Sequence, residues 1–209
     1  MFGRGDSSFS IEDTHILQGT DAGLDLSHQR LGLVATLINS KIMIVHIVMA
    51  SCTVERSNSL VYLDFKFRKD IKKRKSVSVQ NSMFLSNKVT LEANQTTKGG
   101  GVFYLYESDS VFERNVFINN TLTNGNGGTL TADCDSLSQL SCVNYLEDNL
   151  FEGNQASGRG GAVFTSLYGP VSLNNLMVHN RALRGGNNLG SYPYMLGFLT
   201  KDKRVLTTL

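Results

Sequence analysis

Three pairs of carboxylic acids that lie close together in the sequence are the residues of this chain most suited to catalysis. The pairs are Asp109 with Glu113, Asp133 with Asp135, and Glu147 with Asp148. Hydrolysis of a glycosidic bond requires two carboxyl groups about 5 to 9.5 Å apart, one on each side of the bond. Each pair is explained more simply as a solvated turn or strand edge, and the 4 histidines share no spacing. We therefore expect no catalytic residue, no cofactor and no metal site, since no set of Cys and His has zinc-ligand spacing either.

Two other sets of residues could carry covalent chemistry. Cys134 and Cys142 flank the stretch "DSLSQLS" and could close it with a disulfide, and two free thiols in a loop are the alternative. Asn94 and Asn119 each begin an Asn-x-Thr glycosylation pattern, which matters if a eukaryotic cell secretes the chain. Asn119 is the better candidate, because it neighbours a repeated Asn and is not itself that residue.

These candidates must be positioned by a unit that the sequence repeats four times. The unit is Asn or Ser, any residue, Phe or Met, two more residues and Asn, followed by a polar segment and a Gly-Gly pair. The apolar position is held by Phe84, Phe117, Phe151 and Met177, and the Asn position by Asn87, Asn120, Asn154 and Asn180. The glycine pairs are Gly100-Gly101, Gly127-Gly128, Gly160-Gly161 and Gly185-Gly186. The apolar positions are 33, 34 and 26 residues apart, and ordered repetition of this kind indicates a repeat architecture.

A fifth and more degenerate copy is predicted near the start of the chain. The stretch "SIEDTHILQGTDAG" (10–23) aligns with "YLEDNLFEGNQASG" (145–158), and Ile16 then takes the place of Phe151. This copy extends the repeat over nearly the whole chain.

The composition of each unit predicts short strands separated by turns. Runs such as "VSVQ", "GVFYLY" and "AVFTSL" are rich in β-branched and aromatic residues. Phe112 lies five residues before Phe117, and an odd separation on one flat strand would put the two side chains on opposite faces. We therefore predict a bend between them at Asn115, and likewise at Asn149, because Asn tolerates the left-handed conformation. The fourth unit departs from the pattern, since Ser172 takes the apolar place.

One such unit cannot bury its own apolar face, so the copies are expected to stack. Stacking about 4.8 Å apart pairs each strand with its equivalent in parallel and aligns the apolar and Asn positions in columns. The glycine pairs are then corners that allow positive φ and close approach between windings. The prediction is an all-β fold, a right-handed parallel β-helix (solenoid) of about four to six coils. It divides into irregular N-terminal coils over 1–75 with a basic insertion at 66–75, repeats over 76–190, and a C-terminal cap or tail over 191–209.

The two motifs Phe-x-x-Asn and Gly-Gly-[Ala/Val/Ile/Leu] resemble the repeats of chlamydial polymorphic outer membrane proteins. Similar repeats occur in pectin-lyase-like surface proteins of protists. The best match is Phe151 to Asn154 with Gly160 to Val163, and the resemblance covers roughly residues 76–190. It implies a passenger-type β-helix displayed outside a cell and used in adhesion.

The predicted function is accordingly a non-enzymatic surface or adhesion module that forms part of a larger surface protein. A net charge of +2 makes no case for a nucleic-acid partner, and the basic run at 66–75 is interpreted as a solvated insertion. A glycan or a cell-surface protein is the partner that fits an extracellular or cell-surface location, although the N-terminus lacks the features of a signal peptide. The first alternative is a pectin-lyase-like carbohydrate-active enzyme.

The second alternative is a membrane-anchored protein. The stretch "LGLVATLINSKIMIVHIVMA" (31–50) is near the roughly 20 residues that a membrane-spanning helix needs. Lys41 and His46 interrupt it, and a lysine near the middle of a span is costly in lipid. We therefore predict two buried strands here. If the protein contacts a membrane, it does so through this stretch or through an anchor outside the chain.

Overall fold

The structure, a computed structural model, consists of short strands and the turns between them. It describes residues 8–12, 15–17, 33–35, 41–45, 48–50, 53–55, 61–64, 76–91, 100–106, 108–134, 142–166, 169–191, 195–199 and 204–208. Side chains are described from residue 76 to residue 191 within these ranges. No helix occurs among these described residues, and none of them therefore offers an apolar helix long enough to cross a bilayer.

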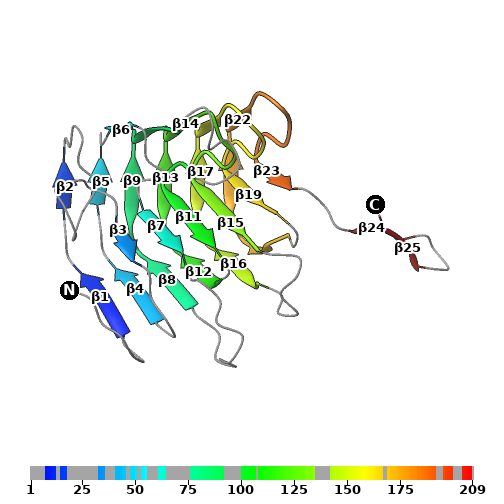
Figure 1. Cartoon of the computed structure of the whole chain (residues 1–209), viewed down its shortest axis with the longest axis horizontal. Helices are drawn as coiled ribbons and strands as arrows, with labels where there is room; N and C mark the ends of the chain where they lie inside the picture. Colours follow the sequence, from blue (N-terminus) through cyan, green and yellow to red (C-terminus); the bar gives the residue numbers. More distant parts are fainter. Residues whose placement is uncertain are drawn as a thin grey trace.

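Four parallel sheets, here named A to D, form the walls of one stack (Figure 1). Sheet A contains β1 (Ser8–Glu12), β4 (Lys41–Val45), β8 (Ser76–Gln80), β12 (Asp109–Glu113), β16 (Asn144–Glu147) and β20 (Val171–Leu173). Sheet B contains β2 (His15–Leu17), β5 (Val48–Ala50), β9 (Met83–Leu85), β13 (Val116–Ile118), β17 (Leu150–Glu152) and β21 (Leu176–Val178). Sheet C contains β6 (Thr53–Glu55), β10 (Lys88–Thr90), β14 (Thr121–Thr123), β18 (Gln155–Ala156) and β22 (Arg181–Ala182). Sheet D contains β3 (Leu33–Ala35), β7 (Val61–Asp64), β11 (Phe103–Tyr106), β15 (Leu130–Asp133), β19 (Val163–Thr165) and β23 (Leu189–Ser191).

The chain visits the sheets in the order A, B, C, D and then starts the next winding. We call each winding a coil and number the coils from the N-terminus, so that β8 to β11 form coil 3 and β20 to β23 form coil 6. Every strand pair within sheets A to D is parallel, as between β9, β13 and β17. The prediction of an all-β parallel β-helix is confirmed, with six coils, whereas the right hand stays a prediction.

The N-terminal region continues the same stack below residue 76. Ile16 shares the register column of Met49, Phe84, Phe117 and Phe151 in sheet B, which is the position that the degenerate copy predicted. The prediction of two strands in 31–50 is wrong, because this stretch contributes three, β3, β4 and β5, to three different sheets. The basic run 66–75 lies outside the described residues.

The C-terminal region forms an antiparallel hairpin of β24 (Met195–Leu199) and β25 (Arg204–Thr208). Among the described strands it joins none of the four sheets of the stack. The assignment of 191–209 as a cap or tail, and the boundaries at 75 and 190, stay predictions.

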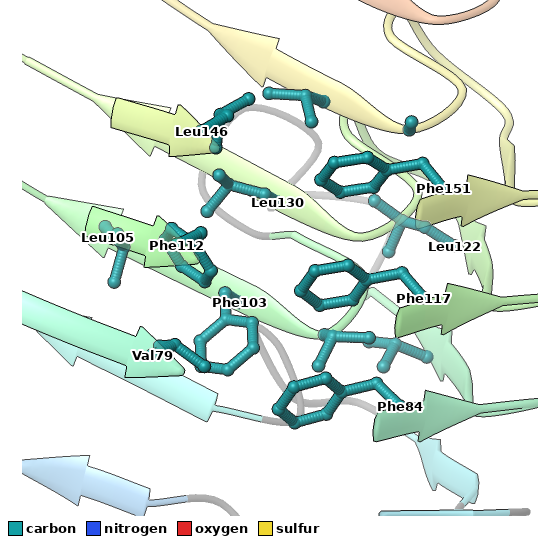
Figure 2. Close-up of a cluster of buried hydrophobic side chains, with 14 of the residues drawn as sticks. Val79, Phe84, Phe103, Leu105, Phe112, Phe117, Leu122, Leu130, Leu146 and Phe151 are labelled. Carbon is teal, nitrogen blue, oxygen red and sulfur yellow. The ribbon is translucent and has the colours of Figure 1, made fainter. Parts of the chain in front are cut away.

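The interior of the stack is a column of aromatic rings in sheet B. Phe84, Phe117 and Phe151 are 0% exposed, because the middle residue of each three-residue strand points inward. Their rings lie parallel, with centroids 5.1 Å apart between Phe84 and Phe117 and 4.8 Å apart between Phe117 and Phe151. Figure 2 shows the three rings one above another beside Leu122. Met177 continues the column in coil 6 and is partly buried, because no described strand stacks on β21.

Other inward residues from sheets A and D complete this core. Phe103 and Phe112 pack edge-on to each other with centroids 5.1 Å apart, and Phe103 lies 5.0 Å from Phe84 (Figure 2). Leu146 is buried below Ser172, the polar residue that the repeat pattern marked as a departure. Ser172 lies in the last coil and is exposed there, so a polar side chain at this position costs little desolvation.

Eight corner residues turn the chain between sheets A and B and between sheets B and C in the left-handed conformation. They are Asn81, Arg114, Asp148 and Asn174 at the first corner, and Ser86, Asn119, Gly153 and His179 at the second. The prediction that Asn115 and Asn149 adopt this conformation is wrong, since the residue immediately before each of them does so. The reason is that the left-handed residue projects outward, whereas Asn115 and Asn149 are buried and use their amides inside the stack.

Candidate functional site

The repeated Asn column is a continuous ladder of buried amides at the corner between sheets B and C. Asn120 Nδ2 donates to Asn154 Oδ1 at 3.0 Å and to the carbonyl of Phe84 at 2.8 Å. Asn87 Nδ2 donates to Asn120 Oδ1 at 2.9 Å, and Asn154 Nδ2 donates to Asn180 Oδ1 at 3.0 Å. Each amide therefore bonds both to the amide of the next coil and to the backbone of the coil before, which satisfies polar groups that burial would otherwise penalise.

A second ladder, which sequence reasoning missed, runs along the corner between sheets A and B. Asn115 Nδ2 donates to Asn149 Oδ1 at 3.0 Å and to the carbonyl of Val79 at 2.9 Å, and Asn149 Nδ2 continues to Asn175 Oδ1 at 2.9 Å. Ser82 begins the ladder, where its backbone N–H donates to Asn115 Oδ1 at 3.0 Å. The sequence does carry a signal for this ladder, since the first position of the repeat is Asn or Ser. The same residue types also favour a bend, which is the structure predicted there.

The first ladder, at the sheet B and C corner, ends on an asparagine of the last coil itself. Asn180 Nδ2 donates to Asn188 Oδ1 at 3.1 Å, and Asn188 Nδ2 donates to the carbonyl of Met177 at 3.3 Å. These are the two bonds that an Asn in a seventh coil would make. Asn188 therefore closes the ladder from within coil 6.

Replacement of Asn188 by alanine is expected to lower the free energy of unfolding by about 1 kcal/mol, because two partly exposed hydrogen bonds are lost. Asn188→Asp keeps the acceptor for Asn180 but sets a carboxylate oxygen against the carbonyl of Met177, so it should be no more stable than Asn188→Ala. Urea denaturation followed by circular dichroism measures both changes. Equal stability of all three proteins would show that Asn188 does not close the ladder.

The glycine pairs lie where neighbouring coils approach most closely. Gly127 and Gly160 have φ of 73° and 67°, which L side chains rarely adopt, and a Cβ added to Gly128 would lie 2.1 Å from the carbonyl oxygen of Gly161. A Cβ added to Gly101 would lie 1.8 Å from the carbonyl oxygen of Gly128. The second glycine of each of the first three pairs is thus required by the backbone of the coil above it.

The fourth glycine pair is shifted by one residue from its predicted alignment. Leu189 pairs with Val163, so Gly186 is the equivalent of Gly160, and Asn187 takes the place of Gly161. A side chain is accommodated at Asn187 because no described strand stacks on coil 6. Its Oδ1 accepts a hydrogen bond from the backbone N–H of Ala182 at 3.1 Å, a group on the open edge of sheet C.

The carboxylic acids that could have formed a catalytic pair are spread over the outside of the stack. Asp109 accepts a hydrogen bond from the N–H of Val143 at 2.8 Å, and Glu113 forms an ion pair with Arg114. Asp133 accepts a hydrogen bond from the hydroxyl of Tyr104 at 3.2 Å. Asp135 lies outside the described residues, and no group of three or more potential metal ligands occurs within the described part of the chain.

The exposed acids Glu147 and Asp148 lie on two different elements. Glu147 faces outward from sheet A and Asp148 occupies the adjoining corner. Glu147 is instead the register neighbour of Glu113 on the next coil, a juxtaposition of acids 34 residues apart that the sequence did not suggest. The Arg114 guanidinium that pairs with Glu113 offsets part of this negative charge.

Cys134 and Cys142 are joined by a disulfide with sulfur atoms 2.06 Å apart. The bond closes a short excursion between sheets D and A, and Cys134 is buried. The double substitution Cys134→Ser/Cys142→Ser is expected to lower the free energy of unfolding by about 2 to 3 kcal/mol, because the open loop gains conformational freedom in the unfolded chain. Guanidinium melts check this value, and the reduced natural protein should show the same loss.

The two glycosylation candidates differ in what the structure describes of them. Asn119 is exposed at a corner with φ of 54°, next to the buried ladder residue Asn120. A Cβ at Gly153, one coil above, would lie 2.3 Å from Asn119 Oδ1, so the side chain of Asn119 leans toward that coil. Asn94 lies outside the described residues, and glycosylation at either site stays a prediction.

Sheets A, B and C present the accessible outer faces of the described coils. Three outward residues in the middle of sheet D are buried, namely Tyr104 (1% exposed), Thr131 (2%) and Phe164 (4%), and Tyr106 and Asp133 at its strand ends are partly buried. A ligand of the described region would therefore contact sheets A, B or C, or the corners between them.

One segment of the chain matches a known protein family. Residues 150–166, which run from β17 through the glycine corner of coil 5 to the end of β19, match the Chlamydia polymorphic membrane protein (Chlamydia_PMP) repeat. No curated protein and no solved structure matches the chain significantly. The chain thus carries a parallel β-helix in which at least one coil resembles the repeats of chlamydial polymorphic membrane proteins.

Proposed function

We propose that this chain is a display module of a cell-surface protein and that its outer faces bind a glycan or a protein on another cell. The observation that carries the proposal is the match of residues 150–166 to a repeat of Chlamydia polymorphic membrane proteins. That likeness supports a surface location, and the adhesive, non-enzymatic role is our inference from the architecture.

The distribution of side chains over the stack supports a display role. Inward positions keep one chemical type from coil to coil, as Phe84, Phe117 and Phe151 do. Outward positions of sheet A change in size and chemistry, since Val111 and Tyr145 occupy one column of that sheet in successive coils. A scaffold whose inner side chains hold the fold leaves its outer side chains free to specify a partner.

Two measurements on the natural protein test this function. Antibodies against the chain should label intact cells of the source organism, and beads that carry the purified chain should bind cells or a defined class on a glycan array. Labelling that appears solely after permeabilisation would contradict the surface location.

The enzymatic alternative is tested on the same material. A polyuronate panel with a reducing-sugar assay should show no product above the background of a heat-denatured sample. Product that disappears in Glu113→Gln or Glu147→Gln would replace the adhesion proposal with a carbohydrate-active enzyme, because these are the adjacent carboxyl groups on sheet A.

A further inference from the structure

The outer face of sheet B is apolar over consecutive coils. Eight outward positions are described, four strands with two positions each, and Glu152 is the one that carries a charge. The other seven are Met83, Leu85, Val116, Ile118, Leu150, Leu176 and Val178. Met83 is 39% exposed and Leu176 57% exposed, so solvent reaches this face at both ends of the described strip.

The register extends the same strip to the start of the stack. Val48 and Ala50 of β5 hold the register positions of Met83 and Leu85. In β2, Leu17 holds the position of Ala50 and His15 that of Val48. Apart from His15 in coil 1 and Glu152 in coil 5, the apolar sequence pattern therefore runs through all six coils. The parallel strands of sheet B place these positions in two straight columns.

The neighbouring sheet C shows that the stack does not require an apolar exterior. Its described outward positions are Lys88, Thr90, Thr121, Thr123, Gln155 and Arg181. Sheets B and C both consist of short strands, of three residues in sheet B and of two or three in sheet C, and their second residues point inward, so the main difference lies in the outer face. A contiguous apolar face on one side of a soluble scaffold indicates an interface.

The two rims of the apolar strip carry opposite charge. The rim toward sheet A contains Glu113, Glu147 and Asp148, with Arg114 paired to Glu113. The rim toward sheet C contains Lys88 and Arg181, and Glu152 at the end of β17 adjoins it, so that the cations outnumber the carboxylate there.

We propose that the apolar face of sheet B binds a second copy of this chain, with the two-fold axis parallel to the axis of the stack. Two copies with their B sheets in contact can be related by an axis along the stack or by one along the strands. An axis along the stack sets the acidic rim of each copy against the basic rim of its partner. An axis along the strands would set the acidic rims against each other, and the opposed carboxylates would repel.

The size of the strip fits a dimer that forms at moderate concentration. Six coils about 4.8 Å apart and five residues of about 3.3 Å each give a strip of roughly 29 by 17 Å, or about 480 Å². Stable interfaces bury about 800 Å² per partner, so both charged rims must contribute to the contact. The dimer should consequently weaken as salt screens the rims.

Sedimentation velocity of the full chain over a range of concentrations tests the face. The natural protein should form dimers, and Ile118→Glu should be monomeric throughout because it puts a carboxylate at the centre of the contact. Glu152 occupies the same column one coil higher, so the fold accepts this side chain, and an unchanged thermal melt confirms that. Thr123→Glu on sheet C is the matched control and should dimerise like the natural protein. A natural protein that stays monomeric, or a dimer that survives Ile118→Glu, would overturn the proposal.

Charge reversal tests the orientation. Glu147→Arg and Arg181→Glu should each raise the dimer dissociation constant about tenfold, because each sets like charges against each other across both halves of the symmetric contact. The double variant Glu147→Arg/Arg181→Glu should recover most of the loss. Tighter dimers in Glu147→Arg alone would show that acidic rims face each other and would overturn the arrangement proposed here.

Discussion

Replacement of Asn120 by alanine is expected to lower the free energy of unfolding by about 4 kcal/mol. The side chain is 0% exposed and takes part in four hydrogen bonds, two accepted from Asn87 and one donated each to Phe84 and Asn154. Each buried bond contributes about 1 kcal/mol, and the loss is cooperative because one amide links three coils. Chemical denaturation monitored by circular dichroism gives the value directly.

Two variants separate the ladder from nonspecific damage at this corner. Asn119→Gly changes the adjacent exposed asparagine and should be nearly neutral, because Gly153 holds the equivalent left-handed position in the next coil. Asn120→Asp keeps the shape but loses both amide donors, so at neutral pH it should be at least as harmful as alanine. If Asn120→Ala cost no more than Asn119→Gly, the ladder would not contribute to stability.

Replacement of Phe117 by alanine should also cost about 4 kcal/mol, within the range of 3 to 5 kcal/mol typical of a buried Phe. Its ring lies between those of Phe84 and Phe151, with centroids 5.1 and 4.8 Å away, and it also contacts Phe103 edge-on at 6.4 Å. Removal would leave a cavity between rigid rings that the stacked backbones above and below cannot collapse to fill.

The matched control is another aromatic residue of the same stack. Tyr145 faces outward from sheet A and is 46% exposed, so Tyr145→Ala should cost less than about 1 kcal/mol. Denaturant melts of both variants at low protein concentration measure the difference. Similar losses for Phe117→Ala and Tyr145→Ala would contradict an aromatic column inside the stack.

Much of the fold follows from the sequence because a solenoid makes the same demand of every coil. The ring in sheet B, the Asn beside it and the glycine corner recur at fixed separations, so their repetition alone predicts parallel stacking. The same logic gives Ile16 its place, since an aliphatic side chain meets the requirement that Phe151 meets. Coil 2 does not show the repeat in its sequence, because Cys52 takes the place that Asn takes in the later coils. Cys52 precedes Thr53, the register partner of Lys88.

The corner positions that were predicted wrongly depend on which of two adjacent residues faces inward. Asn115 was expected to bend the chain, yet Arg114 bends it, because the amide is worth more as a buried hydrogen-bonding group than as a turn residue. The glycine pair of coil 6 is misaligned for a similar reason. Close approach restricts a position solely where another coil follows, so Asn187 can replace a glycine at the end of the stack.

The outer face of sheet B could not be recognised from sequence patterns alone. Its residues are separated by about 30 positions along the chain and become one surface when the coils stack. Hydrophobic residues on both faces of a short strand are also typical of fully buried strands, so Val116 and Ile118 gave no sign of facing solvent. The disulfide between Cys134 and Cys142 could not be predicted for another reason. The spacing of two cysteines alone does not decide between a bridge and two thiols.

The parallel register of the coils is tested most directly by engineered cysteines in sheet C, in a Cys52→Ser background. Lys88 and Thr121 are register partners 33 residues apart, and their Cα atoms should be about 4.8 Å apart, within disulfide range. Lys88 and Thr123 lie on the same face but two residues out of register, about 8 Å apart and too far to bridge. Oxidation followed by peptide mass spectrometry should reveal a disulfide in Lys88→Cys/Thr121→Cys and none in Lys88→Cys/Thr123→Cys. Absence of the first bond, or equal formation of both, would contradict the stacked coils.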